Sequence, residues 1–95
     1  MSKKKTALPN FSGKCLSISI INDTHNYDIY DPTFETQGGR LFITGKVPKG
    51  ATDSNWAMNS QIFVAWDRVS DYYVFKNLKA YKKAIKTSEK YQKKN

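Results

Sequence analysis

The sequence predicts a mainly β domain with a C-terminal helix, arranged as a five-stranded small β-barrel closed by that helix. Apolar and polar residues alternate in several short segments, most clearly where serines separate Leu16, Ile18 and Ile20, and this period of two is typical of half-buried strands. Aromatic residues make up 14% of the chain, which favours a compact β-rich domain. From about Lys76 the apolar residues recur at helical spacing instead.

The first part of the chain contains two predicted strands. Residues 14–22 form the first one, and the Asn, Asp and Thr side chains of 22–26 favour a turn because they bond to nearby backbone. The second strand covers about 27–36. Pro32 inside it indicates an edge position or a bulge, since proline cannot donate a ladder hydrogen bond.

Gly38 and Gly39 predict a tight hairpin turn into a third strand at 40–48. Gly45 lies at a core-facing position of that strand, where a glycine often marks the bend at which a small barrel turns a corner. A long polar loop follows and leads to the next strand.

A fourth strand is predicted at 61–66, a one-turn interruption at 67–70, and a short fifth strand at 71–75. The core-facing residues expected on the last three strands are Leu41, Ile43, Ile62, Val64, Tyr72 and Val74.

The segment from Ile62 to Phe75 resembles the end of small SH3-like and Sm-like barrels, in which strand four breaks into one 3₁₀ turn and strand five continues the sheet. The resemblance covers roughly residues 11–75 and lies in strand order and spacing. It implies the fold rather than a function. An OB-like barrel and an open α+β roll are the alternatives.

A length of 95 residues allows one small domain with one core. We predict a basic flexible N-terminal arm at 1–10, the barrel at 11–75, an amphipathic basic helix packed on the barrel at 76–92, and a frayed tail at 93–95. The net charge of +8 is concentrated in the two ends, because the body between residues 6 and 75 has more acidic than basic residues.

The predicted helix separates apolar from basic side chains. One face is expected to carry Val74, Leu78, Tyr81, Ile85 and Ser88, and the lysines fall in an opposing arc of about 120°. Such a row of lysines favours salt-dependent contact with a DNA or RNA backbone. The candidate nucleic-acid-binding residues are Lys79, Lys82, Lys83, Lys86 and Lys90. The alternative is a solvated face that serves solubility.

Aromatic residues provide the second candidate surface. Tyr30, Phe42, Phe63, Tyr73 and Phe75 lie out of phase with the expected core, so they either stack on unpaired bases or are buried, with Phe42 and Phe63 under the helix. The candidate protein-contact residues are Trp56, Tyr30 and Tyr73. Alternatively, Trp56 folds over one end of the barrel as a lid.

The sequence predicts neither an enzyme nor a cofactor or metal site. His25 is the lone histidine and Cys15 the lone cysteine, and the glycines match no phosphate-binding motif. No signal peptide or membrane span is predicted, which favours a cytoplasmic location. We therefore predict a non-enzymatic nucleic-acid-associated module that binds through its lysine-rich helix. A protein-interaction or homo-oligomerisation module, with lysines serving solubility, is the alternative.

Overall fold

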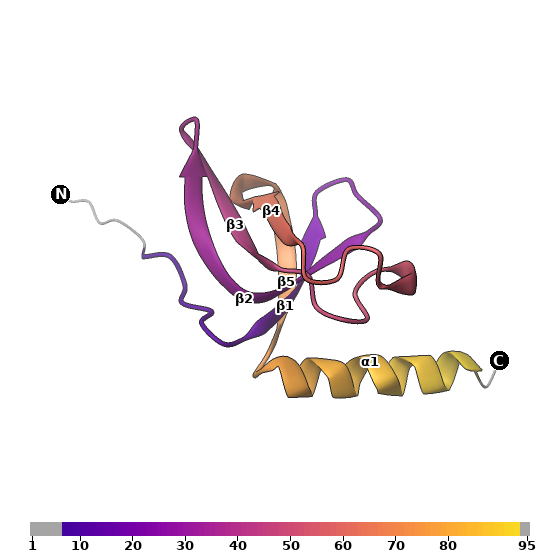
Figure 1. Ribbon diagram of the computed structural model, residues 1–95. Helices are drawn as coiled ribbons and strands as arrows, with labels where there is room; N and C mark the ends of the chain where they lie inside the picture. The colour runs from indigo at the N-terminus through magenta and orange to yellow at the C-terminus, as the bar shows by residue number, and fades with distance from the viewer. Residues whose placement is uncertain (1–6, 94–95) are drawn as a thin grey trace.

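The computed structural model describes residues 7–93, and the side chains of residues 7–89, as one antiparallel sheet followed by one helix (Figure 1). The elements are β1 (Cys15–Ile20), β2 (Asn26–Gln37), β3 (Arg40–Lys46), the 3₁₀ turn η1 (Asp53–Asn55), β4 (Gln61–Ala65), the 3₁₀ turn η2 (Trp66–Arg68), β5 (Val69–Phe75) and α1 (Leu78–Lys93). The mainly β architecture with a C-terminal helix is thus confirmed.

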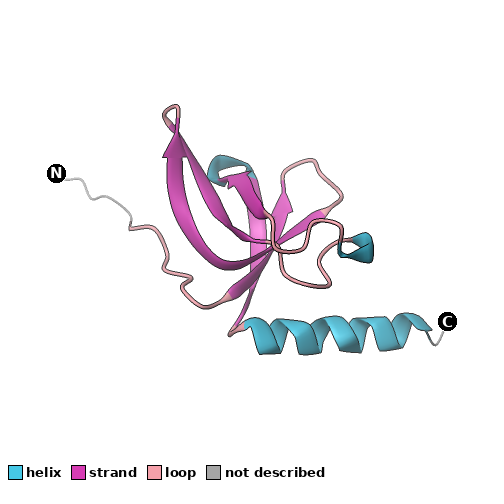
Figure 2. Ribbon diagram, viewed as in Figure 1, coloured by secondary structure: helices cyan, strands magenta, loops and turns pink. Residues whose placement is uncertain are grey.

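The five strands lie in the order β4-β3-β2-β1-β5, so β4 and β5 form the two edges. Figure 2 shows the strands together, with the helix α1 running below them. Within residues 7–93 no ladder pairs β4 with β5, and the sheet is therefore open along this line. The chain passes from one edge strand to the other through η2. This turn begins one residue earlier than the predicted interruption. Strand β5 correspondingly begins at Val69, which pairs with Ile20 across a register shift in β1.

The predicted alternation in β1 is confirmed by the burial of its residues, and it defines a core face and an outer face of the sheet. The core face carries fully buried Leu16, Ile18, Ile29 and Ile43. Two residues of the expected core are instead exposed, namely Tyr72 (37%) and Val74 (48%). Both belong to the edge strand β5, which has a neighbouring strand on one side only.

A bulge bends β2 where Pro32 predicted an edge position or a bulge. The pairing of β2 with β3 shifts between Tyr30 and Thr33, and Asp31 adopts a left-handed φ of 53°. Asp31 is held there by two hydrogen bonds, since its backbone N–H donates to the Lys14 carbonyl and its carboxylate accepts from the Gly13 N–H. Gly45 of β3 packs closely against this bulge, because a Cβ placed on it would lie 2.6 Å from the Tyr30 carbonyl oxygen.

The outer face carries Phe42 and Phe63, whose ring centroids lie 6.4 Å apart. We predicted burial of this pair under the helix, and this is wrong, because α1 packs near β5 instead. Phe42 is partly buried beneath the Arg40 guanidinium, 5.9 Å from its ring centroid, and Phe63 is 39% exposed. Among residues 7–93, no helix is long and apolar enough to cross a membrane.

Candidate functional site

The helix α1 begins at Leu78 rather than at the predicted residue 76, because Asn77 caps it. The Asn77 side-chain oxygen accepts a hydrogen bond of 2.8 Å from the Ala80 backbone N–H, which satisfies a donor that the helix leaves free. The first turn contains no acidic residue and includes Lys79, a charge that the helix dipole disfavours at this end. The helix therefore depends on its packing against the sheet.

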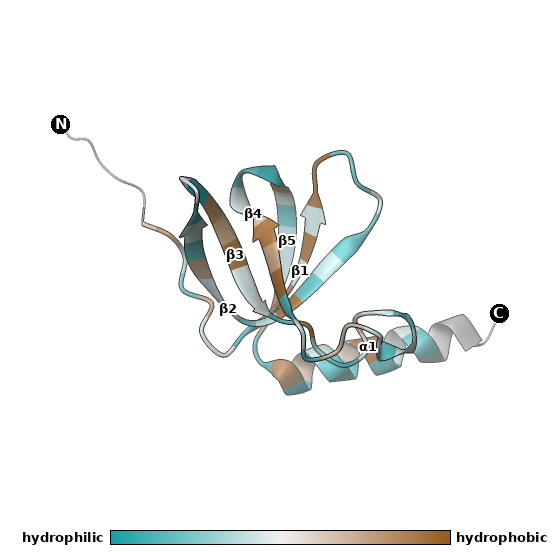
Figure 3. Ribbon diagram, turned by 45° about the horizontal axis from the view of Figure 1, so that its top comes forward, coloured by the Kyte–Doolittle hydropathy of each residue, from teal (hydrophilic) through white to brown (hydrophobic). Residues whose placement is uncertain are grey.

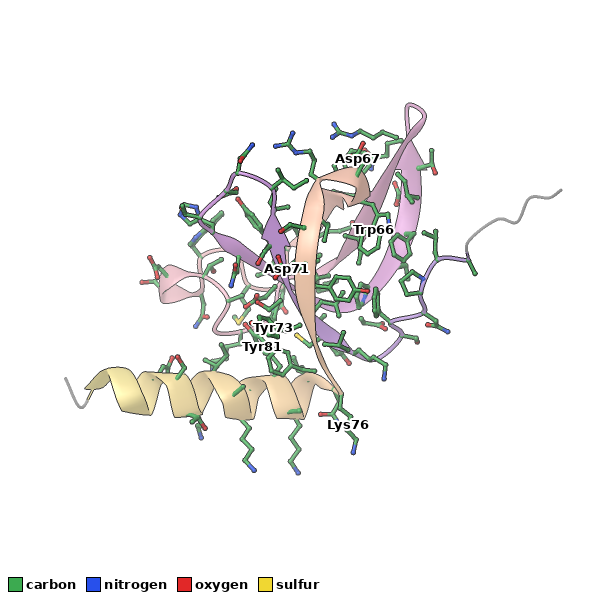
Figure 4. The ribbon with its side chains drawn as sticks, turned by 180° about the vertical axis from the view of Figure 1, so that it is seen from behind. Trp66, Asp67, Asp71, Tyr73, Lys76 and Tyr81 are labelled. Carbon is green, nitrogen blue, oxygen red and sulfur yellow. The ribbon has the colours of Figure 1, made fainter. Side chains whose placement is uncertain are left out.

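Tyr81 anchors α1 to the outer face of the sheet. Its side chain is 1% exposed and points from the helix toward the strands, whereas Lys76 points away (Figure 4). The ring lies edge-on to Phe75 at 5.5 Å, and the hydroxyl donates a 2.5 Å hydrogen bond to Asp28 Oδ2. Burial, this hydrogen bond and the charge of Asp28 raise the pKa of Tyr81. The phenol thus stays protonated and keeps donating.

A second contact holds the helix against the β3–β4 loop (residues 47–60). Gly50, at a φ of 92°, lies against Ile85, and a Cβ placed on this glycine would come 3.2 Å from Ile85 Cγ2. The Gly50 N–H donates to Asn55 Oδ1 at 2.7 Å, which closes the loop over η1. Figures 1 and 3 both show the loop running alongside α1.

Between residues 49–55 of this loop and α1 lies a groove of about 780 Å³, which we call the lysine groove. Its basic lining residues are Lys49, Lys79, Lys82, Lys83 and Lys86. Asp53 and Glu89 are its only acidic lining residues among the described side chains, so the lining carries a formal charge of +3. All five lysines are exposed, and none of them is ion-paired with a described carboxylate.

The structure brings four of the five predicted lysines together and adds one. Lys79, Lys82, Lys83 and Lys86 all line the groove, while the side chain of Lys90 lies outside the described residues. Lys49 was missed, because nothing in its local sequence places the loop beside the helix. Of the predicted apolar helix face, Val74 lies in β5 and Ser88 is exposed, so those two assignments are wrong.

Trp56 lies at the end of η1 and is 79% exposed, so the alternative of a lid over the core is wrong. It lines a second groove of about 710 Å³, the aromatic groove, together with Tyr27 and Phe63. Tyr30 and Tyr73, the other predicted protein-contact residues, do not line this groove. Tyr73 is 67% exposed on β5 and Tyr30 is half-buried beside the β2 bulge.

Cys15 is fully buried beneath α1 and is expected to be unreactive. Burial, with a smaller effect of the Asp28 charge, raises the pKa of the Cys15 thiol to about 12. At pH 8 the thiol is therefore almost entirely protonated, whereas the thiolate is the reactive form. We expect an aromatic disulfide reagent to leave native Cys15 unmodified and to modify it completely in denaturant. Rapid modification of the native protein would show that α1 does not cover this site.

Other polar side chains form isolated contacts. Among the described residues, the His25 ring bonds to Asp23 alone, at 3.2 Å, and the side chain is 76% exposed. Within residues 7–93 no group of three or more His, Cys, Asp or Glu side chains is arranged to hold a metal ion. Comparison with known proteins finds no matching protein family, no similar curated protein and no similar solved structure.

Proposed function

We propose that the protein is a non-enzymatic module that binds the sugar–phosphate backbone of a nucleic acid in the lysine groove. One observation carries the proposal: Lys49 of the β3–β4 loop lies on the same groove as Lys79, Lys82, Lys83 and Lys86 of α1, and none has an ion-pair partner among the described side chains. Charges from two elements far apart in the chain therefore converge.

Phosphate groups match this groove better than a single carboxylate ligand does. The lysines are spread along successive turns of α1, as a repeating anion requires, and each one that neutralises a phosphate releases a counterion. Lysine acts as a point charge, which favours contact with the backbone rather than planar recognition of one group. The ligand is therefore a nucleic-acid strand held largely independently of its sequence.

We also propose that the sheet has an SH3-like or Sm-like fold. The order β4-β3-β2-β1-β5 and the single 3₁₀ turn between the two edge strands support it. In such a barrel the edges β4 and β5 would close through η2, which packs against β3.

A protein-interaction module would use a different surface. The edge strand β5 is exposed over most of its length, with Tyr73 at 67%. Tyr73 is the single predicted protein-contact residue on β5, whereas the five lysines share one groove. The convergence of charge favours the nucleic acid.

Two variants of equal charge test the lysine groove. Lys49, Lys82 and Lys86→Gln removes three groove lysines, and Lys14, Lys46 and Lys76→Gln removes three lysines outside the groove. In binding titrations with a single-stranded oligonucleotide, we expect the groove variant to lower the slope of log K against log salt by about 2, since each phosphate contact contributes about 0.7. The control variant should nearly keep the wild-type slope. An equal loss in both variants, or no binding by the wild type, would contradict the proposal.

A further inference from the structure

The lysine groove and the aromatic groove adjoin each other. Ala51, Thr52 and Asp53 line both of them, and we call this shared stretch of the β3–β4 loop the wall. Trp56 follows this stretch directly along the chain, after η1. The exposed indole ring of Trp56 therefore lies on a groove that adjoins the lysine groove.

The aromatic groove has the chemistry of a site for flat, neutral groups. Trp56 is 79% and Phe63 39% exposed, so both rings are accessible. Among the residues described, no lysine or arginine lines this groove, and the carboxylates of Asp28 and Asp53 disfavour a phosphate there. The neutral amides of Asn26 and Gln61 offer hydrogen-bond donors and acceptors beside the rings.

We propose that the ligand is a single strand, with its phosphates in the lysine groove and an unpaired base stacked on Trp56 across the wall. The proposal rests on the function proposed above and names its substrate class. Stacking on an aromatic ring needs a base that is free of its partner strand, and it tolerates any base because each has a π-face. A duplex offers the lysines the same phosphates but keeps its bases stacked inside, so it cannot use Trp56.

Trp56 itself reports the stacking. The other tryptophan, Trp66, is partly buried and packs edge-on against Phe34 at 5.0 Å, so its fluorescence should respond little to a ligand. We expect a single-stranded oligonucleotide to quench the protein's fluorescence and the Trp56→Phe variant to lose this quenching. The phenyl ring of that variant should retain most of the affinity, whereas Trp56→Ala should weaken binding roughly 5- to 150-fold.

An abasic strand of the same length distinguishes the contributions of the two grooves to binding. It carries the phosphates without the bases, so Trp56→Ala should leave its affinity unchanged while the groove variant Lys49, Lys82 and Lys86→Gln weakens it. The same sequence annealed as a duplex should likewise be insensitive to Trp56→Ala. Parallel titrations with the deoxyribose and ribose forms of the strand identify which of them binds more tightly.

Three results would overturn this inference. The first is that wild type and Trp56→Ala bind the normal strand with equal affinity. The second is that Trp56→Ala weakens the binding of normal and abasic strands equally. The third is that a lysine-rich peptide quenches the fluorescence and the oligonucleotide does not. The last would assign the two carboxylates and Trp56 to a cationic protein segment. If abasic binding still depended on Lys49, Lys82 and Lys86, the proposed function would stand while the base-stacking site failed.

Discussion

Alanine in place of Gly45 is expected to lower the free energy of unfolding by about 3 kcal/mol, the upper range for overpacking a core. A Cβ at this position would lie 2.5 Å from Ile29 Cγ2 and 2.6 Å from the Tyr30 carbonyl oxygen. Ile29 is fully buried in the core of the domain. The Tyr30 carbonyl belongs to the backbone of the β2 bulge, so it can shift only if the pairing of β2 with β3 changes.

Gly38→Ala provides the matched control for this substitution. Gly38 lies in the hairpin turn at a φ of 57°, and a Cβ there would meet no atom within 4 Å. Its replacement should lower the free energy of unfolding by only about 1–2 kcal/mol, because alanine is less stable than glycine in the left-handed conformation. Urea unfolding of both variants measures the difference. A Gly45→Ala protein as stable as Gly38→Ala would show that the bulge does not press against β3.

The strands could be predicted from the sequence because alternation and turn chemistry are local properties. The serines between Leu16, Ile18 and Ile20 identified β1, and the glycine pair at 38–39 identified the hairpin. The length of β5 and the exposure of Val74 could not be predicted, since they depend on which strand becomes an edge.

The candidate site was predictable only in its helical part. Residues on one face of a helix follow from its geometry, and this placed Lys79, Lys82, Lys83 and Lys86 together. Lys49 joins them through the path of a loop, which the contact of Gly50 with Ile85 determines. Ile85 lies more than thirty residues after Gly50 in the chain, so the local sequence of the loop does not reveal this contact.

Replacing Tyr81 with alanine is expected to detach α1 from the sheet and to lower the free energy of unfolding by about 3–5 kcal/mol, as for other large core aromatics. The substitution removes the ring that packs on Phe75 and the hydroxyl that donates to Asp28. Asp28 Oδ1 already lacks a hydrogen-bond partner among the described residues, so the carboxylate would lose its one side-chain donor. An isolated helix of this length is marginal in water, and far-ultraviolet circular dichroism should show a loss of helical signal.

Tyr81→Phe separates the two parts of this anchor. The ring contact with Phe75 is kept and only the hydrogen bond to Asp28 is lost, which should cost about 1–3 kcal/mol and leave α1 helical. Unfolding by urea and the helical signal of the two variants should therefore diverge. A Tyr81→Ala protein with a full helical signal would show that the contact of Ile85 with Gly50 holds the helix without Tyr81.

The same variants connect the anchor with the proposed function. Tyr81→Ala keeps every lysine and the net charge of +8, but it releases the helix that brings Lys82 and Lys86 beside Lys49. If binding depends on this convergence, the affinity for a single strand should fall and its salt dependence should weaken, while Tyr81→Phe binds like the wild type. Unchanged binding by Tyr81→Ala would mean that the lysines act through charge alone, because a detached basic helix attracts phosphates without forming a groove.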